Sequence, residues 1–460
     1  MKYRGNKMMV KLLLYVIVSL LSSQAIWSQQ KPITLASPVS KQMAEFLSAY
    51  NTGDVNVLSK FFVEHFDKSA LEKRSAAERA KANVATFNIT RQLKLHSSKQ
   101  TTEYEIVALF QSQVTEAWFS ITLEVAPQPP NSIIKQTFGF AVRPADAVPH
   151  GKLSKNQIAK ELNTYVAKLV AADMFTGALI VARNDKPIYK KAYGLDASKT
   201  PNGIDTKFDL ASLTKMFTSV AIAQLAQQGK LSYNDSIGKF LPDYPNKQAA
   251  EKVTLHHLLT HTSGLTEYSD KKEYRPARDV GNTFKTLKDW FPFFAADPLA
   301  FQPGEKSDYC NSNFIVLGAI LEKITGQDYF DYMQKRVFRL AEMNNTDFSV
   351  ARGNSAGGGL STVKDLLKFS IALRKHKLLN AKYTDIILSP KTNTGEDEAY
   401  GYGFEVIKIN GKKIVGHSGG GGADNQLDIY LDEDYTVVIL ATPFAGVNIT
   451  RKLRELITQE

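Results

Sequence analysis

The sequence predicts an α+β protein with two domains, a small one over residues 39–143 and a larger one over residues 152–460. In the first part, helical periodicity precedes four strand-like runs, an order typical of an α+β unit. In the second, strand-like runs stand near both ends and the middle, 208–400, is mostly helical, which implies a discontinuous antiparallel sheet. Between the two, Pro- and Ala-containing residues 144–151 are typical of a linker.

Residues 1–28 are expected to be a secretory signal peptide and to lie outside the fold. A basic start ends at Lys11, the apolar run Leu12–Leu21 follows, and small and polar residues come next. That run is short for a membrane span, although an uncleaved anchor is the alternative. We therefore expect a secreted protein, periplasmic or extracellular, with no integral membrane span after signal removal.

Charge and cysteine content argue against nucleic-acid binding and against an intrachain disulfide. The net charge is +11, and loss of four basic residues with the signal peptide would leave +7. Basic residues are interleaved with acidic ones and form no stripe with aromatic residues, so we expect no nucleic-acid binding. Cys310 is the only cysteine, so no intrachain disulfide can form.

The small domain is expected to begin with helices. Met43, Phe46 and Tyr50 recur at helical spacing, and Asp54 can cap a second helix. A third helix is expected over 70–81, followed by strands over 87–95, 104–111, 118–125 and 133–142. The order resembles the cone-shaped domains of the nuclear-transport-factor and cystatin-like type. A packing or spacer role is favoured over ligand binding, and the partner of this domain is left open.

The larger domain is expected to begin with a helix capped by Ser154. Strands are predicted over 177–183 and 187–193. Asn410-Gly411 between 404–409 and 412–417 is a strong hairpin signal. Two more strands and a final helix are expected over 426–431, 435–441 and 448–458.

The first candidate catalytic motif is Ser212-Leu213-Thr214-Lys215. Apolar residues 216–229 predict a helix, which places Ser212 near its start and on the same face as Lys215. A desolvated, neutral lysine can accept the serine proton. Alone, this pattern also occurs by chance on surface helices.

Two further segments add polar groups to this pair. Tyr309-Cys310-Asn311 follows a Pro-Gly turn, and a phenol beside the serine could relay a proton to a leaving group. His417-Ser418-Gly419-Gly420 begins on a predicted strand and enters glycines, which let substrate approach the backbone. A backbone N–H there could complete an oxyanion hole with that of Ser212.

In this order, the three segments resemble the β-lactamase and penicillin-binding-protein superfamily in its class C-like branch. Two more stretches fit the resemblance, His261-Thr262-Ser263-Gly264-Leu265 and Gly357-Gly358-Gly359-Leu360-Ser361. It covers about residues 152–460 and implies a β-lactamase/transpeptidase-like fold, an antiparallel sheet flanked by helices plus a helical lobe.

The resemblance also implies roles for site residues. Ser212 would be the acylated nucleophile, Lys215 its activating partner and Tyr309 the general acid/base. The substrate and oxyanion groups would be Asn311, His417, Gly419 and Gly420. No cofactor is implied, and the substrate would be a small molecule or peptide.

One departure from the family pattern affects the expected substrate. His417 stands where class C enzymes have a lysine, and histidine is only partly charged near neutral pH. This favours an esterase or D-peptidase over an efficient β-lactamase. The alternative is a penicillin-binding or sensing module with little turnover.

Two alternative roles concern polar residues near these motifs. Cys310 could act as a nucleophile, but a simply buried thiol is favoured. His257 and His261 stand four apart, yet no His-Glu-x-x-His pattern or suitably spaced carboxylate accompanies them, so we expect no metal.

Overall fold

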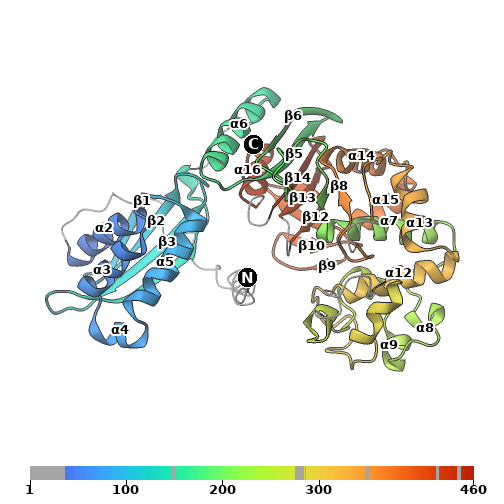
Figure 1. The fold of residues 1–460 in the computed structure, drawn as a ribbon, viewed down its shortest axis with the longest axis horizontal. Helices are drawn as coiled ribbons and strands as arrows, with labels where there is room; N and C mark the ends of the chain where they lie inside the picture. The colour runs from blue at the N-terminus through green and yellow to red at the C-terminus, as the bar shows by residue number, and fades with distance from the viewer. Residues whose placement is uncertain are drawn as a thin grey trace. The chain divides into compact units, whose positions relative to one another are not determined.

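The computed structural model describes residues 37–147, 151–274, 284, 286–348, 353–420, 424–442 and 447–459. The predicted signal peptide and linker residues 148–150 lie outside these ranges. The chain divides into two compact units between residues 150 and 151, both drawn in Figure 1. Within the described ranges, no helix is long and apolar enough to cross a membrane.

The N-terminal unit has helices followed by one antiparallel sheet in the order β1-β2-β3-β4. Its core combines aromatic and aliphatic side chains, and inside it the buried Tyr50 hydroxyl lies 2.7 Å from Thr90 Oγ1. The elements are α2 (Pro38–Asn51), α3 (Val55–His65), α4 (Lys68–Lys73), α5 (Ala76–Thr90), β1 (Leu93–Thr102), β2 (Glu105–Ser112), β3 (Trp118–Val125) and β4 (Ile133–Phe140), with a short turn η2 (Ala145–Ala147) after them.

One part of this unit differs from the prediction. The helix expected over 70–81 is two helices, and the strand expected from residue 87 begins only at Leu93. Ser75 and Glu78 form a capping box that starts α5. The helix then continues through Phe87 to Thr90, because both side chains are buried in the core and packing overrides their β preference.

The second unit is built on an eight-stranded antiparallel sheet in the order β6-β5-β14-β13-β12-β11-β10-β9. Helices cover both faces (Figure 1), which confirms the predicted α+β fold with a helical lobe. The strands are β5 (Gly177–Arg183), β6 (Lys186–Tyr193), β9 (Thr392–Asn393), β10 (Glu398–Tyr400), β11 (Glu405–Ile409), β12 (Lys412–Gly419), β13 (Asn425–Tyr430) and β14 (Tyr435–Ala441), and a separate pair is β7 (Phe208–Asp209) with β8 (Leu360–Ser361).

The helices of this unit pack on the sheet and on each other. α6 and α16 lie against β6 and β14, while α14 lies against β14 and β5. They are α6 (Lys155–Ala171), η3 (Ala211–Leu213), α7 (Thr214–Gln227), α8 (Ile237–Phe240), α9 (Lys247–Lys252), α10 (Leu255–Leu259), η4 (Tyr268–Asp270), η5 (Leu287–Phe293), α12 (Ser312–Thr325), α13 (Tyr329–Met333), η6 (Gln334–Phe338), α14 (Val363–Arg374), α15 (Ala381–Leu388) and α16 (Val447–Thr458).

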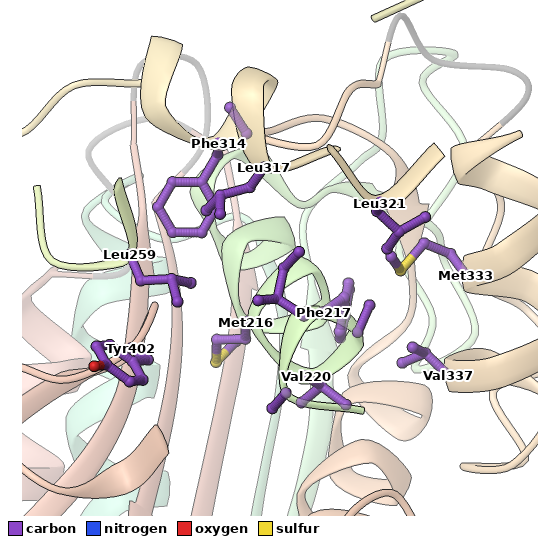
Figure 2. Close-up of a cluster of buried hydrophobic side chains, with 14 of the residues drawn as sticks. Met216, Phe217, Val220, Leu259, Phe314, Leu317, Leu321, Met333, Val337 and Tyr402 are labelled. Carbon is purple, nitrogen blue, oxygen red and sulfur yellow. The ribbon is translucent and has the colours of Figure 1, made fainter. Parts of the chain in front are cut away.

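Helix α7 is the centre of this unit's core. Every residue from Thr214 to Ala226 is buried. Figure 2 shows Met216, Phe217 and Val220 in one apolar cluster with side chains of α12. Buried neighbours surround α7, whose first turn carries Lys215, and Ser212 lies in η3 directly before it.

Candidate active site

The turn that carries Ser212 is fixed by backbone contacts on both sides. Ala211 has a φ of +48°, a conformation that L-residues rarely adopt, and its N–H donates to Asp209 Oδ1 at 2.7 Å. Leu210 N–H donates to Gly359 O, and Gly358 N–H donates to Ala211 O. The Gly357–Ser361 stretch therefore supports the turn and holds Ser212 at the entry to α7.

Lys215 is fully buried, and its Nζ has three close partners. Nζ lies 3.1 Å from Ser212 Oγ, 2.6 Å from Asn311 Oδ1 and 2.6 Å from the Ala356 carbonyl oxygen. None of these partners is a carboxylate. Desolvation lowers the pKa of Lys215 to about 7, so a large fraction of the amine is neutral near neutral pH.

When Lys215 is neutral, its three partners determine which group its lone pair faces. A neutral amine has two N–H groups and one lone pair. Asn311 Oδ1 and Ala356 O can only accept hydrogen bonds, so they take the two N–H groups. The lone pair is left for the Ser212 hydroxyl, the arrangement that general-base activation requires.

Tyr309 is the second group in contact with the serine oxygen. Its hydroxyl donates to Ser212 Oγ at 2.8 Å, and its ring lies 4.8 Å from Lys215 Nζ. Desolvation raises the pKa of Tyr309, although its bond to Ser212 opposes the rise. The phenol is therefore protonated in the free protein and can serve as a proton donor.

The loop that presents Tyr309 is anchored on the segment 261–264. Asp308 N–H donates to His261 O, Gly304 N–H donates to Thr262 O, and Cys310 N–H donates to His261 Nδ1. The His261 imidazole also packs against the Tyr309 ring, with 4.2 Å between ring centres and a tilt of 32°. This segment thus positions the phenol without touching Ser212.

Strand β12 runs past the nucleophile turn. A Cβ added at Gly419 would lie 2.7 Å from Leu210 O, so glycine permits this approach. Ser418 N–H, on the side facing β11, donates to Glu405 Oε1 at 3.1 Å. Gly420 directly follows Gly419, the last residue of β12. A Cβ at Gly420 would meet nothing within 4 Å, consistent with space for a ligand oxygen.

His417 is buried in a hydrogen-bonded chain behind Tyr309. Because Cys310 N–H donates to His261 Nδ1, His261 Nε2 carries the proton and can donate to the Tyr400 hydroxyl at 3.3 Å. Tyr400 can then donate to His417 Nε2 at 2.8 Å, and His417 Nδ1 to Ser418 O at 2.6 Å. Desolvation lowers the pKa of both histidines, in keeping with neutral rings.

The other residues considered as nucleophile or metal ligands have structural contacts. The Cys310 thiol is buried, which raises its pKa to about 12 and disfavours the reactive thiolate. His257 Nδ1 accepts from Thr254 N–H at the start of α10. Over the part of the chain that the structure describes, no three His, Cys, Asp or Glu side chains group as metal ligands would.

Comparison with known proteins identifies the family. Residues 162–459 match the Beta-lactamase family, so the chain belongs to it. Penicillin-binding protein 4* of Bacillus subtilis (strain 168) is 27% identical over 333 residues, 62% of this chain and 72% of its own. The fold and the resemblance predicted from sequence are confirmed, and the chain is a serine hydrolase of this fold.

Solved structures agree in fold. A penicillin-binding protein from Bacillus halodurans has a TM-score of 0.56 and 27% identity, covering 66% of this chain and 100% of that one. D-amino acid amidase from Ochrobactrum anthropi SV3 has a TM-score of 0.53 at 21% identity, covering 65% and 98%. The second, at this identity, supports the fold alone.

The structure brings the sequence-predicted residues Ser212, Lys215, Tyr309 and Asn311 into direct contact, with Gly419 beside the turn. Both His417 ring nitrogens have protein partners, so its predicted contact with substrate stays a prediction. Sequence analysis missed Glu267, the Ala356 carbonyl and Tyr400. Glu267 lies just after the 261–265 motif, which is the one signal that could have drawn attention to it.

Proposed function

We propose that this chain forms an acyl-enzyme on Ser212 and hydrolyses an ester or an amide of the D-amino-acid peptide kind. The observation that carries the proposal is the set of partners around Lys215 Nζ: two acceptors and the serine hydroxyl. The proposal includes export, which rests on the basic and apolar start of the sequence.

In the proposed reaction, Ser212 Oγ bonds to the substrate carbonyl carbon while its proton passes to Lys215 Nζ. The carbonyl oxygen becomes an oxyanion, which the N–H groups of Ser212 and Gly420 can stabilise. When the intermediate collapses, the proton held by Lys215 returns to the leaving group, with Tyr309 as relay. A water oxygen then bonds to the acyl carbon while Tyr309 and Lys215 take its proton; the bond from the acyl carbon to Ser212 Oγ breaks, and that proton returns to Oγ.

A neutral, buried group at position 417 supports an esterase or D-peptidase over an efficient β-lactamase. A lysine there would offer a permanent positive charge to the carboxylate of a β-lactam. The His417 ring is buried, with a lowered pKa, and offers none.

The test is a substrate panel with the wild-type protein and Ser212→Ala. The panel holds short-chain nitrophenyl esters, D-amino-acid amides, D-alanyl peptides and a chromogenic cephalosporin. We expect esters or D-amino-acyl substrates to be hydrolysed faster than the cephalosporin, fluorophosphonate to label Ser212, and Ser212→Ala to lose at least 1000-fold in rate. Ser198→Ala, on an exposed loop, is the control and should match wild type.

Two results would contradict this proposal. If wild type turns over none of the substrates and Ser212 stays unlabelled, the hydrolase assignment is wrong. If penicillin acylates Ser212 stoichiometrically and no substrate turns over, the alternative of a penicillin-binding or sensing module is correct.

A further inference from the structure

Glu267 contacts the site through Asn311, whose side-chain amide lies between Glu267 and Lys215. The side chain is partly buried and caps η4, with Oε1 accepting from Ser269 N–H at 3.1 Å. Its other oxygen, Oε2, accepts twice from Asn311: from the backbone N–H at 2.6 Å and from Nδ2 at 3.1 Å. Both carboxylate oxygens are therefore used to hold neighbouring N–H groups.

These bonds fix which way the Asn311 amide faces. A carboxylate oxygen only accepts, so the atom next to Glu267 must be the amide NH₂ group. Asn311 Oδ1 then faces Lys215 Nζ, 2.6 Å away. A flipped amide would lose its bond to Glu267 and would bring an N–H donor to Nζ instead.

The flipped amide would compete with Ser212 for the lysine lone pair. In the observed orientation, Oδ1 occupies one N–H of a neutral Lys215 and leaves the lone pair for the serine hydroxyl. In the flipped orientation, Nδ2–H could donate into that lone pair, and Lys215 could no longer take the serine proton.

We propose that Glu267 is a positioning residue for acylation, holding the Asn311 amide so that the Lys215 lone pair is directed at Ser212. The proposal rests on the proposed function, because it concerns the same nucleophile. Glu267 touches neither Ser212 nor the reacting atoms, and its positioning effect is exerted through Asn311.

The charge of Glu267 has a separate effect that can be measured independently. Its carboxylate opposes the desolvation that lowers the pKa of Lys215. Loss of the charge should therefore lower the pKa of Lys215 further. In a plot of rate against pH, the acidic limb, where the rate falls as Lys215 becomes protonated, should then move to lower pH. Shortening the side chain at position 267 while keeping its charge should lower the acylation rate and leave the acidic limb at the same pH.

Two conservative variants separate these effects. Glu267→Gln keeps the length, and its amide oxygen is expected to face the two Asn311 donors, at the cost of the bond from Ser269 N–H. Because the Asn311 contacts are kept, we expect a near-normal acylation rate, with the fall in rate at acidic pH moved to lower pH. Glu267→Asp keeps the charge but withdraws the oxygen from Nδ2. We expect its acylation rate constant to fall about 10- to 100-fold, a loss typical of misplaced catalytic groups, with the acidic limb unchanged.

Rates are to be measured per active site, by fluorophosphonate labelling, so that any loss of folded protein is removed from the comparison. Glu273→Ala, a nearby exposed glutamate, is the matched control and should equal wild type. In an Asn311→Ala background, Glu267→Asp should cause little further loss, because the two residues act as a unit.

The outcomes distinguish this inference from the proposed function. If wild type is labelled and active and Glu267→Asp acylates at the wild-type rate, the positioning role is wrong. It is also wrong if Glu267→Asp slows Asn311→Ala as strongly as it slows wild type. If wild type itself is neither labelled nor active, the proposed function fails first.

Discussion

At the residue scale, the chemistry of the site depends on a lysine that is buried without a carboxylate partner. A buried ammonium normally gains a carboxylate that keeps it charged. The partners of Lys215 Nζ are instead a hydroxyl, an amide oxygen and a carbonyl oxygen. Nothing in direct contact offsets the cost of burying its charge, so the free base is available near neutral pH.

The activity should therefore follow the ionisation of Lys215. Since the neutral amine is the active form and its pKa is about 7, kcat/KM for an ester should fall as pH decreases below about 7. Lys215→Met should abolish acylation at every pH. Stopped-flow or steady-state rates between pH 5 and 9 would measure this.

The control for this prediction is Lys364→Met, because Lys364 is a half-buried surface lysine paired with Asp205. It should keep the wild-type profile. An acidic limb that persists unchanged in a Lys215 variant with residual activity would assign that limb to another group and contradict the prediction.

The sequence predicts the site residues that belong to short motifs and misses those that do not. Ser212, Lys215, Tyr309 and Asn311 stand in short patterns with chemical reasons for their spacing. The Ala356 carbonyl carries no side-chain signal, since any residue supplies a carbonyl. Tyr400 and Glu267 act through contacts across the fold, which one-dimensional spacing does not reveal.

At the scale of elements, local signals predicted the longer strands of the second unit well but missed the short strands β7 to β10. The Asn410-Gly411 turn set the β11–β12 hairpin, and the strand ends differ from the prediction by up to two residues. The prediction was wrong at the end of α5, where the β preference of Phe87, Ile89 and Thr90 indicated a strand. Burial of Phe87 and Thr90 decides the outcome there, and burial depends on the assembled core.

Helix α16 is attached to the sheet by a buried ion pair. Arg454 donates from Nε to Asp428 Oδ2 at 2.7 Å and from Nη2 to Oδ1 at 2.9 Å, and Asp428 on β13 is 2% exposed. The bidentate pair raises the pKa of Arg454. Its geometry fixes the position of α16 along β13.

Removing one partner of this pair should destabilise the second unit strongly. Arg454→Met leaves the buried Asp428 carboxylate with no ion-pair partner and only the bond from Gln426 Nε2, so we expect a loss of about 3–5 kcal/mol in the free energy of unfolding. Urea unfolding of the unit would measure it. Lys335→Met, which breaks an exposed pair with Asp331, should cost less than about 1 kcal/mol.

A double variant checks the cause. Adding Asp428→Asn to Arg454→Met removes the unpaired charge and should restore part of the lost stability. If Arg454→Met costs no more than Lys335→Met, the pair contributes little and the assignment of its role is wrong.

At the scale of the whole molecule, the described residues form two hydrophobic cores, one in each unit. The described core of the N-terminal unit draws on residues from Val39 to Phe138, and that of the second unit on residues from Ala178 to Leu440. All the candidate site residues, from Ser212 to Gly420, belong to the second unit. Residues of one unit therefore supply all the candidate catalytic groups.

Each unit should therefore fold without the other. We expect a chain beginning at Gly151 to be labelled at Ser212 and to keep its kcat for a small nitrophenyl ester within about twofold of the full-length value. The full-length protein should unfold in two thermal transitions, and residues 37–147 alone should reproduce one of them. Calorimetry on the three proteins, with ester assays on the two that contain Ser212, would test this. A truncated chain that folds but acylates at least tenfold more slowly would contradict the separation and show that the N-terminal unit contributes to catalysis.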